Sequence, residues 1–267
     1  MRRCEFILST AIVSSAMLGS GAASAADLPA RLYTKAPVMP PSFSWTGFYV
    51  SGGGGYGMWD GNNATVVAPG FPGAGSAVTS TQRMGGDGFF GTIGAGYDWQ
   101  FSSSWVGGIF GDVQFGSIRG TVQDAALGVS GSEKDRTNWA AGLRLGYLVT
   151  PSVLTYVNGG YSGAEFSGAT LSDDFGTGPF STTTSFHRDG WFVGGGVENQ
   201  IGVLGFGPGW FMKTEYRAAE YNRVTLPESF VAGGLPIGLA VTLKPLVQTV
   251  STQLVYRFNW SGVSFGP

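Results

Sequence analysis

The chain has 267 residues, of which 46 are glycine, 14% are aromatic and only 12% are charged, with a net charge of −2. This charge excludes the basic face that nucleic-acid binding requires, and many aromatic residues with few charges argue against a disordered chain. Because a soluble domain has about 25% charged residues and about 7% glycine, the composition favours crowded, close-packed strands.

Residues 1–25 have the order of a secretory signal peptide. Two arginines precede an apolar stretch, and small residues ending in Ala25 follow it, which predicts cleavage between Ala25 and Ala26. The apolar stretch is shorter than the roughly 20 residues of a membrane-spanning helix. Cys4 is the only cysteine of the chain. We therefore expect a mature protein that leaves the cytoplasm without forming a disulfide.

After a proline-rich tail at residues 26–45, the apolar pattern has a period of two. One face of each segment carries apolar and aromatic side chains, and the other carries glycine, polar or charged ones. The segments that show this alternation are about 46–58, 88–99, 105–115, 137–148, 153–163, 189–200, 209–219 and 247–258. Alternation over about ten residues is typical of the strands of outer-membrane barrels.

The connections between these segments alternate in length. The short ones are 100–104, 149–152 and 201–208, and the long ones are 59–87, 116–136, 164–188 and 220–246. Short periplasmic turns and long outer loops are typical of outer-membrane barrels. We expect the first long loop to be mobile. Apolar residues in 220–246 indicate either a contact surface or a strand that continues above the membrane.

These patterns predict an all-β fold, an eight-stranded antiparallel transmembrane up-and-down β-barrel over residues 46–260. Only a closed sheet can span hydrocarbon with strands, because unpaired backbone groups cannot face lipid. A soluble β-sandwich is the alternative, but the signal peptide and the charged second face favour the barrel. An even number of strands places both termini in the periplasm of a Gram-negative bacterium. Residues 261–267 form a short C-terminal extension.

Charged residues fall on the predicted lumen face of the strands. They are Asp98, Asp112, Arg144, Glu198, Lys213, Glu215, Arg217 and Arg257. The interior of an eight-stranded barrel is just wide enough for side chains to fill, and buried charges must pair because desolvation is costly. The sequence therefore favours an internal salt-bridge plug over a gated ion path.

Three stretches of the mature chain resemble a known family, the small outer-membrane immunogenic proteins of alpha-proteobacteria, which are porin-family eight-stranded barrels. These stretches are Ala26-Asp27-Leu28-Pro29 with Tyr33-Thr34-Lys35-Ala36-Pro37, Ser44-Trp45-Thr46-Gly47-Phe48-Tyr49-Val50, and Val255-Tyr256-Arg257-Phe258-Asn259-Trp260. The resemblance implies an abundant surface antigen that stabilises the envelope, and some members are said to bind haem or form weak pores.

Barrels of this kind often end on an aromatic residue that the barrel assembly machinery reads. This chain instead continues past Phe258 to Pro267. Leu254, Tyr256 and Phe258 form an internal candidate for the assembly signal.

Catalysis, metal binding and cofactor binding find little support in the sequence. His187 is the only histidine, and proximity to Ser185 and Asp189 along the chain does not make a catalytic triad. One histidine and no mature cysteine cannot form a zinc cluster. We therefore expect no enzyme activity, no metal and no cofactor, with haem ligation by His187 or outer tyrosines as the alternative.

The sequence thus predicts a structural, surface-exposed barrel that contributes to envelope integrity and surface contact. A narrow pore or a barrel that binds haem or a small ligand is the alternative. The expected partners are outer-membrane lipid and lipopolysaccharide, the barrel assembly machinery, and an extracellular ligand or host factor that contacts the long loops.

Overall fold

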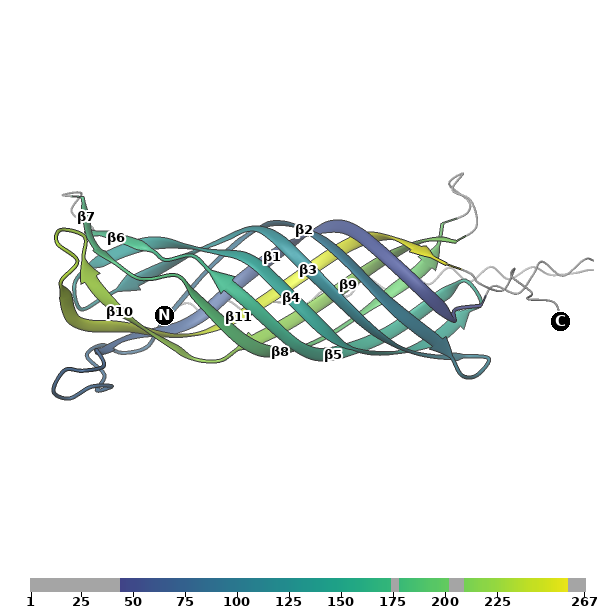
Figure 1. Cartoon of the computed structure of the whole chain (residues 1–267), viewed down its shortest axis with the longest axis horizontal. Helices are drawn as coiled ribbons and strands as arrows, with labels where there is room; N and C mark the ends of the chain where they lie inside the picture. The colour runs from purple at the N-terminus through teal and green to yellow at the C-terminus, as the bar shows by residue number, and fades with distance from the viewer. Residues whose placement is uncertain (1–43, 174–177, 202–208, 259–267) are drawn as a thin grey trace, which may run out of the picture. The chain divides into compact units, whose positions relative to one another are not determined.

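The computed structural model describes residues 44–173, 178–201 and 209–258. Over these ranges the chain forms eleven β-strands (Figure 1). They are β1 (Gly47–Val67), β2 (Gln82–Gln100), β3 (Trp105–Asp124), β4 (Val129–Thr150), β5 (Val153–Phe166), β6 (Thr170–Asp173), β7 (Pro179–Thr182), β8 (Phe186–Gln200), β9 (Trp210–Tyr221), β10 (Val224–Phe230) and β11 (Pro236–Arg257).

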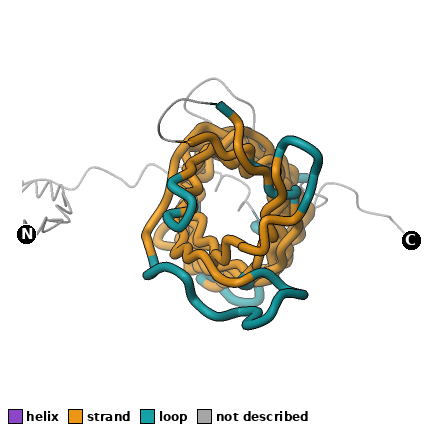
Figure 2. The backbone as a smooth tube through the Cα atoms, turned by 90° about the vertical axis from the view of Figure 1, so that its left-hand side faces the viewer, coloured by secondary structure: helices purple, strands orange, loops and turns teal. Residues whose placement is uncertain are grey.

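Eight of the strands form a closed antiparallel barrel, as the alternation predicts. β1, β2, β3, β4, β5, β8, β9 and β11 pair in this order. β11 then pairs with β1 along most of its length, from Tyr49 opposite Arg257 to Val67 opposite Leu239. Viewed along the barrel axis, the strands form a ring (Figure 2). The prediction of an eight-stranded antiparallel barrel is confirmed.

The two ends of the barrel differ. Short connections at residues 101–104 and 151–152 lie at one end, which we call the turn end. Long hairpins lie at the other end, which we call the hairpin end (Figure 1). The described parts of the chain contain no helix that is long and apolar enough to cross a membrane.

The strands extend further toward the hairpin end than predicted. Most of the loops expected at 59–87 and 116–136 is strand, because β1 continues to Val67, β2 begins at Gln82, β3 continues to Asp124 and β4 begins at Val129. The apolar face changes sides along these strands. In β3, Ile109 and Phe115 point outward, whereas Ile118 and Val122 point inward after a bulge. The alternation with outward apolar residues therefore ends before the strand itself ends, and the predicted strand is too short.

Three short strands rebuild the sheet at the hairpin end, where β5, β8 and β9 stop. β6 pairs with β4, β7 with β6, β10 with β7 and β11 with β10. The segments 164–188 and 220–246 therefore include strands in place of the expected loops. The segment 220–246 does continue as strands, with a reversal at 231–235. Val231 and Leu235 are exposed at this reversal, so the contact surface stays a prediction.

The outer surface of the barrel is apolar over the predicted strands. Ile93, Ile109, Leu143 and Val157 are each more than half exposed, as lipid-facing side chains must be. The hydroxyls of Thr214 and Thr252 lie 3.2 Å apart on this face. These hydroxyls can therefore satisfy each other where water is absent.

Candidate functional site

The barrel lumen holds all eight charged residues that the sequence placed there. These side chains come from β2, β3, β4, β8, β9 and β11, and each residue is at most 9% exposed. Asp98, Asp112, Glu198 and Glu215 face Arg144, Lys213, Arg217 and Arg257, so carboxylates and cations are equal in number. Among these eight residues no charge is left in excess, which avoids the large cost of isolated buried ions.

Two arginines and two acids form a network near the turn end. Arg144 donates Nε to Asp98 Oδ1 at 2.7 Å and Nη1 to Glu198 Oε2 at 3.1 Å, and its Nη2 also contacts Asp98. Arg257 contacts the same two acids, Asp98 at 2.7 Å and Glu198 at 2.8 Å. Each arginine therefore bridges two acids from other strands, which ties β2, β4, β8 and β11 together across the lumen.

Aromatic rings surround this network, and one of them comes from outside the strands. Arg144 lies 4.5 Å from the ring centre of Tyr49, and Arg257 lies 4.6 Å from that of Trp45. Trp45 is 1% exposed, and its indole Nε1 donates to the carbonyl of Pro151 at 3.1 Å. Trp45 therefore packs into the turn end of the lumen and stacks on a buried cation.

Sequence reasoning assigned Trp45 to the tail and gave it no site role. It precedes the alternating segment, so the period-two pattern does not include it. The one feature of the sequence that could have indicated this role is that Trp45 is a large aromatic residue directly before the first strand.

A second network lies further along the lumen. Arg217 binds both oxygens of Asp112, at 2.9 and 2.7 Å, and Oε1 of Glu215 at 2.8 Å. Glu215 Oε2 also accepts hydrogen bonds from Tyr156 Oη at 2.8 Å and Asn158 Nδ2 at 2.9 Å. Arg144 of the first network lies 5.3 Å from the ring centre of Tyr156, and Lys213 is buried on β9 next to Glu215. The two networks therefore form one balanced group of charges.

Inward glycines provide the space for these large side chains. A Cβ at Gly108 would lie 2.0 Å from Asp98 Oδ1, and one at Gly96 would lie 2.5 Å from Tyr49 Oη. Neither position can hold a larger residue unless the network moves. Glycine within these strands thus permits close approach.

A small enclosed cavity lies beside the second network. Its lining includes Asp112, Arg217, Asn138, Ser162 and Tyr221, and its volume is about 10 Å³. About one water molecule needs this much space. The side chains therefore fill the lumen almost completely at this level.

The half of the lumen nearer the hairpin end holds a large apolar cluster, together with four buried acids, Asp124, Glu133, Asp135 and Glu228. Trp59, Phe90, Ile118, Phe192 and Leu243 belong to its cluster of buried hydrophobic residues. The expectation that the inward face is glycine, polar or charged throughout is therefore wrong here. Outside the membrane the outer face of the sheet meets water, so burial inside the ring becomes the favourable place for apolar side chains.

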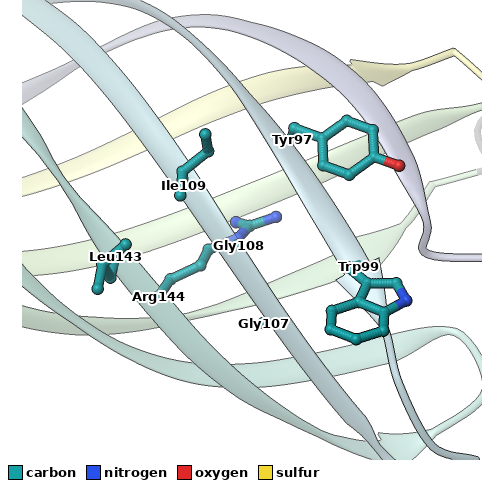
Figure 3. A pocket seen from close by; sticks show the side chains of 7 residues that line it. All are labelled: Tyr97, Trp99, Gly107, Gly108, Ile109, Leu143 and Arg144. Atoms are coloured by element: carbon teal, nitrogen blue, oxygen red, sulfur yellow. The ribbon is translucent and has the colours of Figure 1, made fainter.

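A groove on the lipid-facing side lies directly against the first network (Figure 3). Tyr97, Trp99, Ile109 and Leu143 line it, together with Gly107 and Gly108, and its volume is about 640 Å³. Arg144 lies on the other side of β3, behind the two glycines. At this point a single layer of glycine backbone separates the lipid from the lumen charges.

The remaining predicted residues lie outside the lumen. Leu254 and Phe258 face outward near the turn end, and the Tyr256 ring lies 5.0 Å from that of Phe258. The predicted cleavage residues, Ala25 and Ala26, lie outside the described residues.

His187 is an exposed residue at the start of β8. Its Nε2 lies 3.0 Å from Asp189 Oδ1. His187 and Ser185 line the same crevice, and no hydrogen bond joins them among the described interactions. Over the residues that the structure describes, no group of three or more histidine, cysteine or acidic residues is arranged to hold a metal.

Comparison with known proteins gives a consistent result. The 31 kDa outer-membrane immunogenic proteins of Brucella melitensis and Brucella suis are each 29% identical to this chain over 231 residues, covering 84% of this chain and 92% of theirs. The crystal structure of OprG from Pseudomonas aeruginosa aligns with a TM-score of 0.53 at 12% identity, covering 80% of this chain and 97% of OprG.

A family model described as "Outer membrane protein beta-barrel domain" matches residues 13–258. These residues include every described strand. The protein is therefore a member of this family of outer-membrane β-barrels.

Proposed function

We propose that the protein is a non-catalytic, structural barrel that strengthens the outer membrane and presents its hairpin end at the cell surface. The observation that carries this proposal is the filled lumen. Two arginines each bridge two acids near the turn end, and an apolar cluster fills the other half. An ion that crosses the barrel would have to displace both.

The proposed orientation rests on the lengths of the connections at the two ends of the barrel. The hairpin end carries the longer connections, and outer-membrane barrels have their longer loops outside. Gly47 and Arg257, the first and last strand residues, both lie at the turn end. We propose that this end faces the periplasm. A cysteine introduced at Gly73, in the 68–81 reversal, should then react with a membrane-impermeant maleimide on intact cells. Labelling only after the cells are broken would contradict this orientation.

Single-channel recording tests the plug. We expect the purified mature chain, inserted into planar bilayers, to show no large and steady conductance. The variant Arg144→Ala/Arg257→Ala removes both bridging cations and should increase the frequency of open events. A steady conductance in the unmodified protein would favour the narrow pore and overturn the plug.

Binding of haem or a small ligand is the remaining alternative. His187 is the one histidine of the chain, and its Nε2 already faces Asp189. A haem titration with no Soret shift would remove this alternative. A shift that disappears in His187→Ala would support it.

A further inference from the structure

Of the outward-facing cations toward the hairpin end, two have acidic partners. Arg83 pairs with Asp60, and Lys244 pairs with Glu220. Arg119, Lys134 and Arg136, which we call the basic cluster, form no ion pair within the described part of the chain. Three cations that form no ion pair among the described residues therefore lie together on β3 and β4.

The backbone holds the basic cluster together. Arg119 is directly opposite Lys134 in the β3–β4 pairing, which places their Cβ atoms about 5 Å apart. Arg136 lies two residues from Lys134, at a bulge in the β4–β5 pairing. Like charges directly opposite each other destabilise a sheet. An anion bound between them would remove this repulsion.

Acidic residues near the basic cluster form no ion pair with it among the described residues. Asp87 is opposite Arg119 on β2, but the hydroxyl of Tyr56 binds its carboxylate. Glu165 lies beside Arg136 at the edge of a crevice of about 320 Å³, and no salt bridge joins the two among the described residues. The cluster therefore keeps cations available to an external anion, with a hollow next to them.

The aromatic residues near the basic cluster indicate its level relative to the membrane. Phe115 and Trp139, on the same two strands, are 47% and 36% exposed, and Trp139 lies 5.5 Å from Tyr161 between ring centres. Exposed aromatic rings at strand ends mark the boundary of the hydrocarbon. The basic cluster follows directly beyond this boundary, at the level of lipid headgroups, where long basic side chains extend to reach phosphate.

We infer that Arg119, Lys134 and Arg136 bind the phosphate groups of a phosphorylated glycolipid in the leaflet around the hairpin end. Arginine is suited to phosphate because its planar guanidinium donates two parallel hydrogen bonds. The crevice lined by Arg136 and Glu165 is open and polar and offers space to a sugar ring. The inference rests on the proposed orientation, which places this end in the glycolipid leaflet.

The test measures glycolipid binding to the full mature chain in detergent. Lipid A with both phosphates, lipid A without phosphates and phosphatidylglycerol are titrated and followed by native mass spectrometry. We expect the bis-phosphorylated lipid A to bind most tightly. In Arg119→Gln/Lys134→Gln/Arg136→Gln its affinity should fall about tenfold or more, because three charge-assisted contacts are lost.

A matched control separates the basic cluster from general charge. Arg83→Gln/Lys244→Gln removes two outward cations that already have acidic partners, and it should leave the affinity within about twofold, because paired exposed charges add little. Equal losses in both variants, or no loss in the triple variant, would overturn the inference. Equal binding of phosphatidylglycerol would overturn the assignment to a glycolipid.

Thermal stability gives an independent readout. Without glycolipid, Lys134→Gln relieves the repulsion from Arg119 and should leave the melting temperature unchanged or raised. With glycolipid, the same variant should gain less stabilisation than the unmodified protein. A steady conductance would overturn the plug and leave this binding intact, so the two failures are distinguishable.

Discussion

The two halves of the lumen are filled by different kinds of side chain. Near the turn end, every acid of the networks has a cation, and the side chains on the other face of the strands meet lipid. Toward the hairpin end an apolar cluster dominates the interior. The acids that are buried there, such as Glu228, have no buried cation beside them, because the buried cations of the described chain all lie in the other half. The comparison shows that the surrounding medium decides which face of a strand is apolar. A single strand can therefore have an apolar outer face where lipid surrounds it and an apolar inner face where water surrounds it.

Replacement of Arg144 by methionine is expected to have the largest effect. It leaves Asp98 and Glu198 with only Arg257 between them, and loss of one member of a buried ion pair costs about 3–5 kcal/mol. Urea unfolding in lipid vesicles measures the change in the free energy of unfolding.

Arg83→Met is the control, because it removes an arginine from an exposed pair and should cause no measurable change. If Arg144→Met also left the free energy of unfolding unchanged, the network would not contribute to the stability of the turn end.

Leu226→Ala probes the apolar half. Leu226 on β10 is 3% exposed within the hydrophobic cluster, and a buried leucine truncated to alanine costs about 2–4 kcal/mol when a cavity remains. We expect hydrogen exchange to increase in β10 and in the part of β11 that pairs with it. Exchange near Arg144 should stay unchanged, and a global increase would mean that the two halves unfold as one unit.

The smallest expected effect is the pH dependence of the hairpin end, where Glu228 joins β10 to its neighbours. Burial, together with the nearby Asp124 carboxylate, raises the pKa of Glu228 from 4.5 to about 7, and Ser181 donates a hydrogen bond to it at 2.8 Å. A raised carboxyl pKa stabilises the folded state while the group is protonated. This stability is complete below pH 4.5 and is lost as the pH rises through 7.

Hydrogen exchange of β7 and β10 should therefore be faster at pH 8 than at pH 5.5, once corrected for the intrinsic rate. Glu228→Gln should remove most of this difference, because glutamine does not titrate and still accepts the bond from Ser181. A pH dependence that persists in the variant would assign the effect to other groups.

Alternation in the sequence was sufficient to predict the membrane strands and the inward charges. Asp98 and Arg144 alternate with large apolar residues, so their face followed from spacing alone. Spacing also separates Trp191 from Phe192: Trp191 alternates in step with Val193 and points outward, whereas Phe192 alternates in step with Glu198 and points inward. Alternation was not sufficient toward the hairpin end, where apolar side chains such as Ile118 point inward.

The strands are also longer than the sequence predicted, and the reason is physical. Beyond Met58 the outward positions of β1 are polar or small, and Gly61, Asn62 and Asn63 read as a turn. The pairing partners on β11 and β2 nevertheless keep these residues in the sheet. Long-range pairing of this kind leaves no local signal.

The seam between β1 and β11 has a consequence for how the protein is made. The strand that opens the barrel and the strand that closes it are the two most distant in the chain, and they pair from Tyr49–Arg257 to Val67–Leu239. Until the last residues have been delivered, β1 presents an unpaired edge. The ring therefore cannot close before β11 is present, and a polypeptide truncated before β11 would remain open and prone to aggregation.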